Sequence, residues 1–445
     1  MSNDTPDDDP VSDADVREAL EKAVQMQRRG QLAKAEEVYA AVLTLRPEEP
    51  NALNFLGILR HQQGKQDEAL HYLGRAIQQQ PANPGPWLNL SNVLLEAGEY
   101  TEAVAAMRRV VELKPDSAGV YNNLAILHMR LGHLKEAEKC LAAALERDPN
   151  PGFLHANLGN LYYRTGRYKE SIEHSLRSLG GDRKNDSARW ILTLSLLAHG
   201  ERDRAILNLR DWIEDEPDNP RPRHHLTALG VGEVPQRASD AYVKDMFDSF
   251  ATSFDQKLEK LGYRAPQLVC DALLALGDRL RTGGCILDAG CGTGLCGPLL
   301  RPLAERLEGV DLSEPMLARA TGRNCYDALH AAELTAFIDA APDRFDNIAS
   351  ADTLVYFGDL GPVMAAARRA LKPGGALAAS VEALPDDHPD RHLLQVNGRY
   401  AHSQAYLREV AEQHGLEMIS LQPEILRKEL GDDVHGWVFV AIRPA

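Results

Sequence analysis

The chain has 445 residues, of which 44% are hydrophobic and 26% charged, so it is not a wholly disordered protein. At roughly 150 residues per domain, this length allows two or three folded units. The net charge of -16 argues against a surface that coats nucleic acid or an anionic membrane, because such surfaces need excess positive charge. We therefore expect neither as a partner.

Targeting and metal-binding signals are missing from the sequence. The N-terminus carries no basic, apolar leader, and no apolar run approaches the length of a membrane span. The six cysteines form no CxxC pair, which predicts neither a disulfide framework nor a metal site. Together these features predict a cytoplasmic protein.

The first 15 residues form an acidic segment without lysine or arginine. Such a segment predicts a disordered, solvated leader, with a partner-binding tail as the alternative. Its acidic residues are Asp4, Asp7, Asp8, Asp9, Asp13 and Asp15.

Glycines then recur every 34 residues through the first half of the chain. They are Gly30, Gly64, Gly98, Gly132, Gly166 and Gly200. A small residue follows each glycine by five positions, and a proline follows by 17 positions in every unit except the fifth. The small residues are Ala35, Ala69, Ala103, Ala137, Ser171 and Ala205. This period predicts stacked helix pairs: the glycine ends a first helix, the small residue allows close approach, and the proline stops the second helix.

Residues 16–219 resemble six tetratricopeptide repeats. The third unit matches that repeat well, at Trp87, Leu90, Leu94, Gly98, Ala103 and Pro115. The first unit departs at Lys22, and the fifth departs at Ser171 and Arg183. The resemblance implies an all-α superhelix whose concave face binds a protein or peptide, with a purely structural role as the alternative.

Asparagines recur on the predicted first helices of these units. Asn89, Asn123 and Asn157 share one column, and they either line a peptide-binding groove or form a solvated polar face. Residues 220–241 follow as a linker rich in proline and glycine, in which a short helix from Arg223 to Leu229 is predicted to cap the repeats.

From residue 242 to residue 445, short apolar runs alternate with helical patterns. This alternation predicts a doubly wound, mostly parallel sheet. The predicted strands are Cys285–Ala289, Leu307–Leu312, Tyr326–Ala331, Phe345–Ala351, Ala376–Glu382, Glu417–Leu421 and Gly436–Ile442. The helical segments include Gly361–Leu371 and Ser403–His414.

The first of these strands runs directly into a loop from Asp288 to Gly294 that holds three glycines. Ligands bind at the carboxyl ends of such strands, where bare glycines let the backbone approach closely. The spacing Gly292-x-Gly294-x-x-Gly297 also matches a dinucleotide fingerprint, which is a weak signal alone. The carboxylate of Asp288 suits a cationic ligand better than a pyrophosphate. Asp311, which ends the second strand, can accept both hydroxyls of a ribose.

Three ordered motifs resemble the class I methyltransferases that depend on S-adenosylmethionine (SAM). They are Asp288-Ala289-Gly290-Cys291-Gly292-Thr293-Gly294, Val310-Asp311-Leu312-Ser313 and Leu371-Lys372-Pro373-Gly374-Gly375. The resemblance covers residues 242–445 and implies a Rossmann-like domain with a seven-stranded, mostly parallel sheet whose last strand is antiparallel. Joined to the repeats, it is similar to bacterial predicted methyltransferases that contain tetratricopeptide repeats. Further motifs of that family are Asp248-Ser249-Phe250-Ala251, Gly398-Arg399-Tyr400-Ala401-His402-Ser403 and Leu426-Arg427.

The resemblance also implies roles for single residues around the cofactor, SAM. Gly290, Gly292 and Gly294 would shape the loop around its methionine part. Asp288 would hold its amino group, and Asp311 would bind its ribose.

The adenine end of the cofactor has three candidate contacts. Leu312 and Met316 would pack on the ring, and Glu333 would contact its amine. For Met316 and Glu333, core filling and a solvated carboxylate are the alternatives. An aromatic set, Phe247, Phe250, Phe254 and Tyr263, is interpreted either as a lid over the cofactor or as core packing.

A general base is needed only if the methyl acceptor must lose a proton, since the sulfonium is already activated and positioning supplies most of the acceleration. Candidates for a base are Asp352, Tyr356 and His402, with Tyr400 beside them. The stretch from Asp352 to Tyr356 differs from the Asn/Asp-Pro-Pro-Tyr/Phe motif of enzymes that methylate bases or glutamine, which argues against nucleic acid. We expect the repeats to recruit a protein or peptide acceptor. A small metabolite, or an adaptor with a non-catalytic SAM module, is the alternative.

Overall fold

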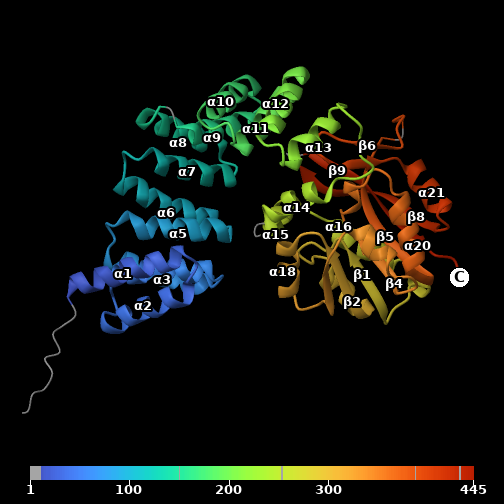
Figure 1. The fold of residues 1–445 in the computed structure, drawn as a ribbon, viewed down its shortest axis with the longest axis horizontal. Helices are drawn as coiled ribbons and strands as arrows, with labels where there is room; N and C mark the ends of the chain where they lie inside the picture. The colour runs from blue at the N-terminus through green and yellow to red at the C-terminus, as the bar shows by residue number, and fades with distance from the viewer. Residues whose placement is uncertain (1–11, 150, 252–253, 386, 430–431) are drawn as a thin grey trace, which may run out of the picture. The chain divides into compact units, whose positions relative to one another are not determined.

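The computed structural model describes residues 12–149, 151–251, 254–385, 387–429 and 432–445 (Figure 1). The chain divides into two compact units, the first ending at Ala205 and the second beginning at Ile206. Within the described residues, no helix combines the length and the apolar character needed to cross a membrane.

The start of the first helix differs from the predicted start of the repeats. Residues 1–11 of the predicted leader lie outside the described residues. Helix α1 (Asp13–Arg28) begins three residues before the expected boundary at residue 16. It begins there because the Ser12 side chain accepts the backbone N–H of Asp15 at 3.2 Å, while the Asp15 carboxylate accepts the N–H of Ser12 at 3.0 Å.

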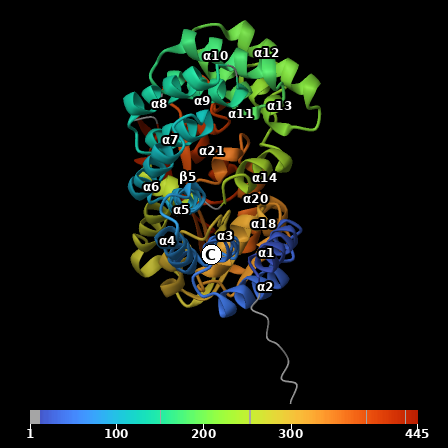
Figure 2. The ribbon, with the colours of Figure 1, turned by 90° about the vertical axis from the view of Figure 1, so that its left-hand side faces the viewer.

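Six helix pairs follow one another, as the 34-residue period predicts. The first helices are α1, α3 (Pro50–Gln62), α5 (Pro84–Ala97), α7 (Ala118–Arg130), α9 (Gly152–Arg164) and α11 (Asp186–Ala198). The second helices are α2 (Leu32–Leu45), α4 (Gln66–Gln79), α6 (Tyr100–Leu113), α8 (Leu134–Arg147), α10 (Tyr168–Gly181) and α12 (Arg202–Asp215). Figures 1 and 2 show the pairs of the first unit, from α1 onward, stacked one on the next. Helix α13 (Pro220–Ala228) begins 34 residues after α11, slightly before the predicted capping helix.

The spaced glycines and small residues do what the repeat pattern predicts. Each of the six glycines has a φ between 74° and 83°, a left-handed conformation that residues with a side chain avoid. The small residues of the second helices lie against small residues of the first helices. In the third pair, for example, Ser91 of α5 donates its hydroxyl to the carbonyl of Ala103 of α6 at 2.9 Å. Ser171, where the fifth unit departs from alanine, donates to the carbonyl of Gly159 at 2.7 Å, so the helix pair is kept.

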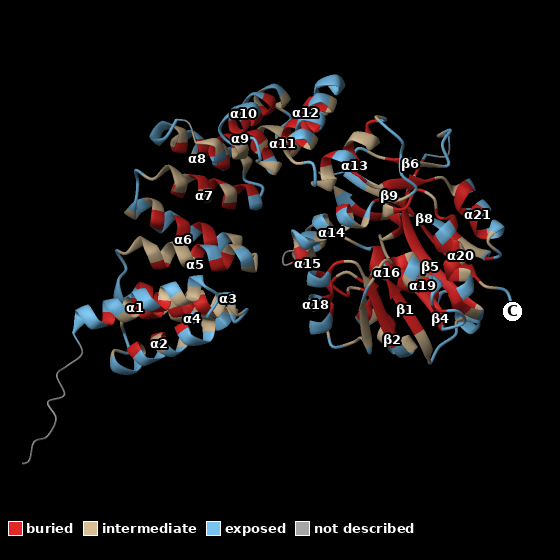
Figure 3. Ribbon diagram, viewed as in Figure 1, coloured by how far each residue is buried: buried red, intermediate tan, exposed pale blue. Residues whose placement is uncertain are grey.

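The second unit is built on a mostly parallel sheet. Its parallel part runs in the order β3 (Ala328–Ala331), β2 (Ala304–Asp311), β1 (Gly284–Ala289), β4 (Phe345–Ser350) and β5 (Leu371–Ala383). Strand β9 (Asp432–Ile442) pairs antiparallel with β5, and β8 (Glu417–Glu429) pairs antiparallel with β9. The central strands β1, β4 and β5 are buried along most of their length, as expected for a sheet covered on both faces (Figure 3).

The sheet has nine strands, and the expected count of seven is wrong. The two additional strands are β6 (His392–Leu394) and β7 (Tyr400–His402). They form because β5 is long: β4 pairs with it only as far as Ala379, and beyond that point Glu382 and Ala383 of β5 pair in parallel with Ala401 and His402. Strand β6 then pairs with β7 as an antiparallel edge.

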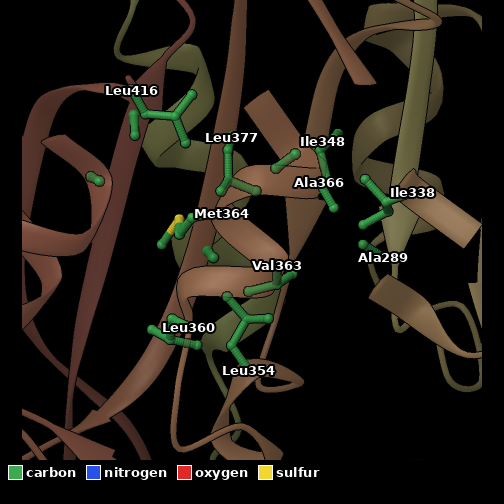
Figure 4. Close-up of a cluster of buried hydrophobic side chains, with 14 of the residues drawn as sticks. Ala289, Ile338, Ile348, Leu354, Leu360, Val363, Met364, Ala366, Leu377 and Leu416 are labelled. Atoms are coloured by element: carbon green, nitrogen blue, oxygen red, sulfur yellow. The ribbon is translucent and has the colours of Figure 1, made fainter. Parts of the chain in front are cut away.

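Helices cover both faces of this sheet. Helices α16 (Ala265–Leu274) and α17 (Gly297–Leu300) pack on one face, and α19 (Leu334–Asp339), α20 (Gly361–Ala370) and α21 (Gln404–Gln413) pack on the other. Neighbouring residues of one strand point to opposite faces. Ile286 lies in the first core, between the sheet and α16, and Leu287 lies in the second core, on the face that α20 covers. Figure 4 shows part of the second core, where Met364 of α20 lies near Leu377 of β5.

The remaining helices lie around the carboxyl ends of the strands or lead into the sheet. They are α14 (Asp240–Asp248), α15 (Phe254–Lys260), α18 (Glu314–Gly322) and short 3-10 turns at Gly277–Arg279, Arg301–Leu303 and Leu354–Tyr356. The predicted turn at Leu371–Gly375 lies inside β5, as an irregularity. Phe345 pairs with Leu371 and Asn347 with Ala376, so the extra residues of β5 bulge between these two pairs.

Candidate active site

A cavity of about 350 Å³ lies in the second unit, where β1, β2, β3 and β4 end. Its lining includes the loops that follow these four strands, together with α14, α15 and the end of β8. Strand order reverses between β1 and β4, and ligands of open α/β sheets bind at such a switch point. The volume falls within the range of small-molecule sites, roughly 300–1,000 Å³.

The glycine loop after β1 forms one wall of this cavity. Gly290, Gly292 and Gly294 have φ values of 77°, 53° and 83°. A Cβ at Gly290 would lie 2.2 Å from the Oγ1 of Thr353, and a Cβ at Gly294 would lie 2.9 Å from the ring of Tyr326. A Cβ at Gly292 would meet nothing within 4 Å. Gly290 and Gly292 line the cavity, so the loop presents bare backbone to whatever it holds.

Asp311 joins the end of β2 to the glycine loop. Its Oδ2 accepts the N–H of Gly292 at 2.9 Å, and its Oδ1 accepts the N–H of Ser313 at 2.9 Å. The residue lines the cavity. Burial raises the pKa of this carboxyl, while the backbone hydrogen bonds oppose the rise. Each carboxylate oxygen has a further lone pair, so Asp311 can also accept hydrogen bonds from a ligand.

Asp288 lies behind the cavity wall. It is 1% exposed and does not belong to the cavity lining. Its Oδ2 accepts the hydroxyl hydrogen of Tyr326 at 2.6 Å, and its Oδ1 has no partner among the described residues. Burial raises the pKa of Asp288 to about 7, and the nearby Asp311 adds to the rise. Its contact with the cofactor's amino group stays a prediction, and its partner Tyr326 was not predicted.

The three candidates at the adenine end separate into two groups. Leu312 and Glu333 line the cavity, whereas Met316 is buried at 1% exposure and does not. The Glu333 carboxylate caps α19 by accepting the N–H groups of Thr335 and Ala336 at 3.0 and 2.8 Å. Met316 thus lies where the core-filling alternative puts it.

The catalytic candidates also separate. Asp352 and Tyr356 line the cavity. His402 is fully buried outside the lining, with its Nε2 3.2 Å from the carbonyl oxygen of Gly358. Burial lowers the pKa of His402 to about 3, which keeps it neutral. Tyr400 is likewise buried and donates its hydroxyl to the carbonyl of Pro235 at 2.7 Å. Sequence position alone could not distinguish a cavity residue from a buried neighbour.

A buried charge cluster, for which no motif in the sequence gave a prediction, includes Asp352. Its members are Asp352, Glu382, Arg399, Arg427 and Glu429. Arg427, 3% exposed, donates hydrogen bonds to all three carboxylates. Arg399 donates to Glu382 at 2.6 Å and to Glu429 at 2.7 Å. The signal was the two arginines in Gly398-Arg399 and Leu426-Arg427, which carried no assigned role.

An aromatic wall closes the cavity from α14 and α15. The ring centroids of Phe247, Phe250 and Phe254 are 5.8–5.9 Å apart, and Phe247 meets Tyr356 edge-on at 5.6 Å. All four rings line the cavity, and Tyr263 lines it too.

Two polar ties hold these helices to the strand ends. The Ser313 hydroxyl donates to Asp248 at 2.5 Å. Asp255 accepts both the Thr293 hydroxyl, at 2.5 Å, and the Arg323 guanidinium, at 2.6 Å. Among the described residues, no group of histidines, cysteines and carboxylates could hold a metal ion.

Comparison with known families defines the class of each unit. Residues 261–421 match a model described as a methyltransferase domain. Residues 20–85, 60–117 and 94–152 match models described as tetratricopeptide repeats. The chain therefore combines N-terminal tetratricopeptide repeats with a C-terminal methyltransferase domain.

Particular relatives match parts of the chain. It is 35% identical over 122 residues to malonyl-[acyl-carrier protein] O-methyltransferase of Pseudescherichia vulneris, covering 26% of this chain and 47% of that one. It is 30% identical over 203 residues to the biotin biosynthesis bifunctional protein BioHC of Teredinibacter turnerae, covering 41% of this chain and 34% of the relative. The chain thus spans less than half the length of these two relatives. A solved structure of Pseudomonas aeruginosa pilF is 15% identical, with a TM-score of 0.42, and covers 48% of this chain and 96% of its own.

Proposed function

We propose that the protein is a SAM-dependent methyltransferase whose repeats recruit a protein or peptide acceptor. The cavity at the strand ends carries this proposal. It combines the bare backbone of Gly290 and Gly292 with the carboxylate of Asp311, and it lies within the residues that match the methyltransferase model.

The residues around the cavity fit SAM. The open space beside Gly292 admits a ligand close to the backbone, and Asp311 offers lone pairs to ribose hydroxyls. Leu312 supplies an apolar contact for a base, and the rings of Phe247 and Phe250 favour a cation. When bound, SAM supplies a methyl group on a sulfonium that leaves as a neutral thioether without a general acid.

The chain's own residues supply positioning. The aromatic wall gives the cavity an apolar side, and the ties at Asp248 and Asp255 hold that wall to the strand ends. Asp352 and Tyr356 stand in the lining as groups that can orient an acceptor. Burial raises the pKa of Tyr356, so its hydroxyl stays protonated and can donate a hydrogen bond at neutral pH. An acceptor held in line needs little more than this positioning.

A protein-borne acceptor is supported by two observations. Tetratricopeptide arrays generally bind peptides or proteins, and six helix pairs precede the methyltransferase domain. Two of the relatives are named malonyl-[acyl-carrier protein] O-methyltransferase, and that name describes a malonyl group carried by a protein. We extend only the protein-borne character of that acceptor to this chain.

The cofactor is tested by calorimetric titration of the full chain with SAM. We expect binding to the wild type and about tenfold or greater weakening in Asp311→Ala, since a hydrogen bond to a charged group contributes about 1.5–3 kcal/mol. Glu314→Ala, which removes an exposed carboxylate three residues away, is the matched control and should bind normally. Absence of binding to the wild type at millimolar SAM would contradict the proposal.

The acceptor is tested with a cell lysate and methyl-labelled SAM. Label that enters protein with the wild type, and not with Asp311→Ala, supports a protein acceptor. Label found only among small molecules contradicts recruitment of a protein and favours a metabolite.

A further inference from the structure

The charges that line the cavity point to the chemistry of the methyl acceptor. Building on the proposed function, we infer that the acceptor presents a protonated amine, which Asp352 binds through its unpartnered oxygen. The methyl acceptor would then be an amine rather than a carboxylate. An ammonium has no lone pair, so it first passes one proton to the Asp352 carboxylate or to water. The freed lone pair of the nitrogen then forms the bond to the methyl carbon, while the electron pair of the broken carbon–sulfur bond stays on sulfur.

The first step is the charge balance of the buried charge cluster. Asp352, Glu382 and Glu429 bring three negative charges, and Arg399 and Arg427 bring two positive ones, which leaves one negative charge uncompensated. The side chains of Glu382 and Arg427 are each 3% exposed, and those of Asp352, Arg399 and Glu429 are 15%, 18% and 33% exposed. An excess charge at such a depth is costly unless a cation pairs with it.

The second step is that neither arginine keeps two adjacent nitrogens uncommitted for a bidentate grip on an anion. Arg427 uses its Nε, Nη1 and Nη2 on three different carboxylates. Arg399 uses its Nε on Glu382 and its Nη2 on Glu429. A bidentate grip on a substrate carboxylate would have to displace one of these pairs.

The other basic side chains of the lining, within the described part of the chain, also have partners. Arg237 donates to Asp240 at 2.5 Å and to the carbonyl of Ala238 at 3.2 Å. The Lys257 ammonium lies 4.6 Å from the centroid of the Phe250 ring. A free carboxylate entering the cavity would therefore have to compete with these contacts for the basic side chains.

The third step is the hydrogen bonding of Asp352 itself. Arg427 holds its Oδ2, whereas its Oδ1 is buried and has no hydrogen-bond partner among the described residues. Its backbone has a φ of 57°, uncommon for a residue with a side chain, and its N–H donates to the hydroxyl of Ser380 at 2.8 Å. Such strained, incompletely satisfied groups gather at functional sites. A cationic N–H donor from a ligand would give Oδ1 a hydrogen-bond partner and would also neutralise the excess negative charge of the cluster.

The fourth step is the surroundings of that carboxylate. The rings of Phe247, Phe254 and Tyr356 line the same cavity, and aromatic faces attract cations. The Phe250 ring, in the same wall, already contacts the Lys257 ammonium. An ammonium group gains from both the carboxylate and the rings. A sulfonium also gains from the rings, but it has no hydrogen to donate to Oδ1.

The test compares the full-length wild type with Asp352→Asn, because asparagine tolerates a left-handed φ and keeps the size of the side chain. The substitution removes the charge and exchanges one acceptor oxygen for an NH2 group. Asp359→Asn is the matched control, since Asp359 is a loop carboxylate outside this cavity. The amine probe is N-acetyl-lysine amide and the carboxylate probe is N-acetyl-glutamate amide. Each is titrated with and without S-adenosylhomocysteine. The cofactor probes are SAM, S-adenosylhomocysteine and methylthioadenosine, which lacks the amino-acid part.

We expect the wild type and Asp359→Asn to bind the lysine probe and Asp352→Asn to bind it about tenfold or more weakly, with methylthioadenosine unchanged as a check on folding. The inference is overturned if the glutamate probe binds in preference, or if neither probe binds while S-adenosylhomocysteine does. It is also overturned if Asp352→Asn weakens the binding of S-adenosylhomocysteine and SAM alone, because Oδ1 would then bind the cofactor's own amino group. The same holds if the substitution weakens the binding of SAM alone, because Asp352 would then contact the sulfonium.

Failure of the proposed function gives a different result. In that case the wild type binds none of the three cofactor probes. The lysine probe titrated without cofactor then decides the inference alone: binding lost in Asp352→Asn supports an amine site, and equal or absent binding overturns it.

Discussion

The hydroxyl of Thr353 donates a hydrogen bond to the carbonyl oxygen of Gly290 at 3.2 Å, and the same side chain fills the space that a Cβ at position 290 would take. Strand β4 thereby closes against the glycine loop of β1. The contact explains why the loop needs glycine here for two reasons, a φ of 77° and a neighbour at 2.2 Å.

Gly290→Ala is therefore expected to destabilise the second unit by about 2 kcal/mol or more, because the strained φ and the overlap with Thr353 both oppose it. Hydrogen exchange in urea, measured on peptides from β1, reports this change. Gly283→Ala is the matched control. Gly283 has a φ of 71°, but a Cβ added there would meet nothing within 4 Å, so the substitution should cost only about 1 kcal/mol. Equal losses of stability in the two variants would show that the overlap with Thr353 does not contribute to the destabilisation.

Gly292→Ala is expected to weaken SAM binding strongly while it lowers the stability of the second unit only a little. A methyl group there meets no protein atom within 4 Å, but it enters the cavity that we assign to the cofactor. Stability should fall by about 1 kcal/mol, as in Gly283→Ala, while calorimetry should show SAM affinity lowered about tenfold or more. Unchanged affinity would remove Gly292 from the cofactor site.

Much of the fold could be predicted from the sequence because its signals are periodic. The glycines from Gly30 to Gly200 keep one period, and the strands from β1 to β5 each include apolar residues within a short segment that lies between helical patterns. Strands β6 and β7 were missed because each has three residues and depends on pairing with the far end of β5. No local pattern in the sequence records such a pairing.

The sequence predicts those parts of the candidate site that belong to one short motif. It does not predict the parts that distant segments of the chain form together. The glycine loop and Asp311 belong to short motifs next to strands, and both line the cavity. The buried charge cluster draws its members from residues 352 to 429, and only the order of the strands brings them together. His402 and Met316 have suitable chemistry, but burial outside the cavity is a tertiary property.

Arg427→Met is expected to destabilise the second unit by about 3–5 kcal/mol. The substitution removes the only guanidinium in the described structure that contacts all three carboxylates of the buried charge cluster, and it leaves those charges with Arg399 alone. Urea unfolding followed by hydrogen exchange on β8 peptides measures the loss. Arg279→Met serves as the control, since Arg279 is more than half exposed and lies 3.9 Å from Glu417, and it should change stability by at most about 0.5 kcal/mol. A loss below about 1 kcal/mol for Arg427→Met would mean that the cluster is far more hydrated than its burial indicates.

Asp288→Asn is expected to remove one contribution to the pH dependence of stability of the second unit, namely a loss of stability with rising pH. Burial raises the pKa of Asp288 from 3.8 to about 7, so the folded state holds a proton that the unfolded state has released. The stabilisation is therefore present below about pH 4 and is lost as the pH rises to about 7, with an upper bound of roughly 4 kcal/mol.

The asparagine variant carries no titrating group at this position, so it should gain stability relative to the wild type between pH 4 and pH 8. The slope that remains is expected to come from other buried groups. These include Asp311, whose pKa is raised by burial, and His402 and His225, whose pKa values burial lowers to about 3 and whose contributions to stability have the opposite sign. Hydrogen exchange of β1 peptides in urea, at matched pH values, gives the difference. Asp278→Asn, at an exposed position, should follow the wild type. If Asp288→Asn also follows the wild type across this range, Asp288 is already ionised in the folded protein near pH 4, and it compensates its burial with a partner other than Tyr326.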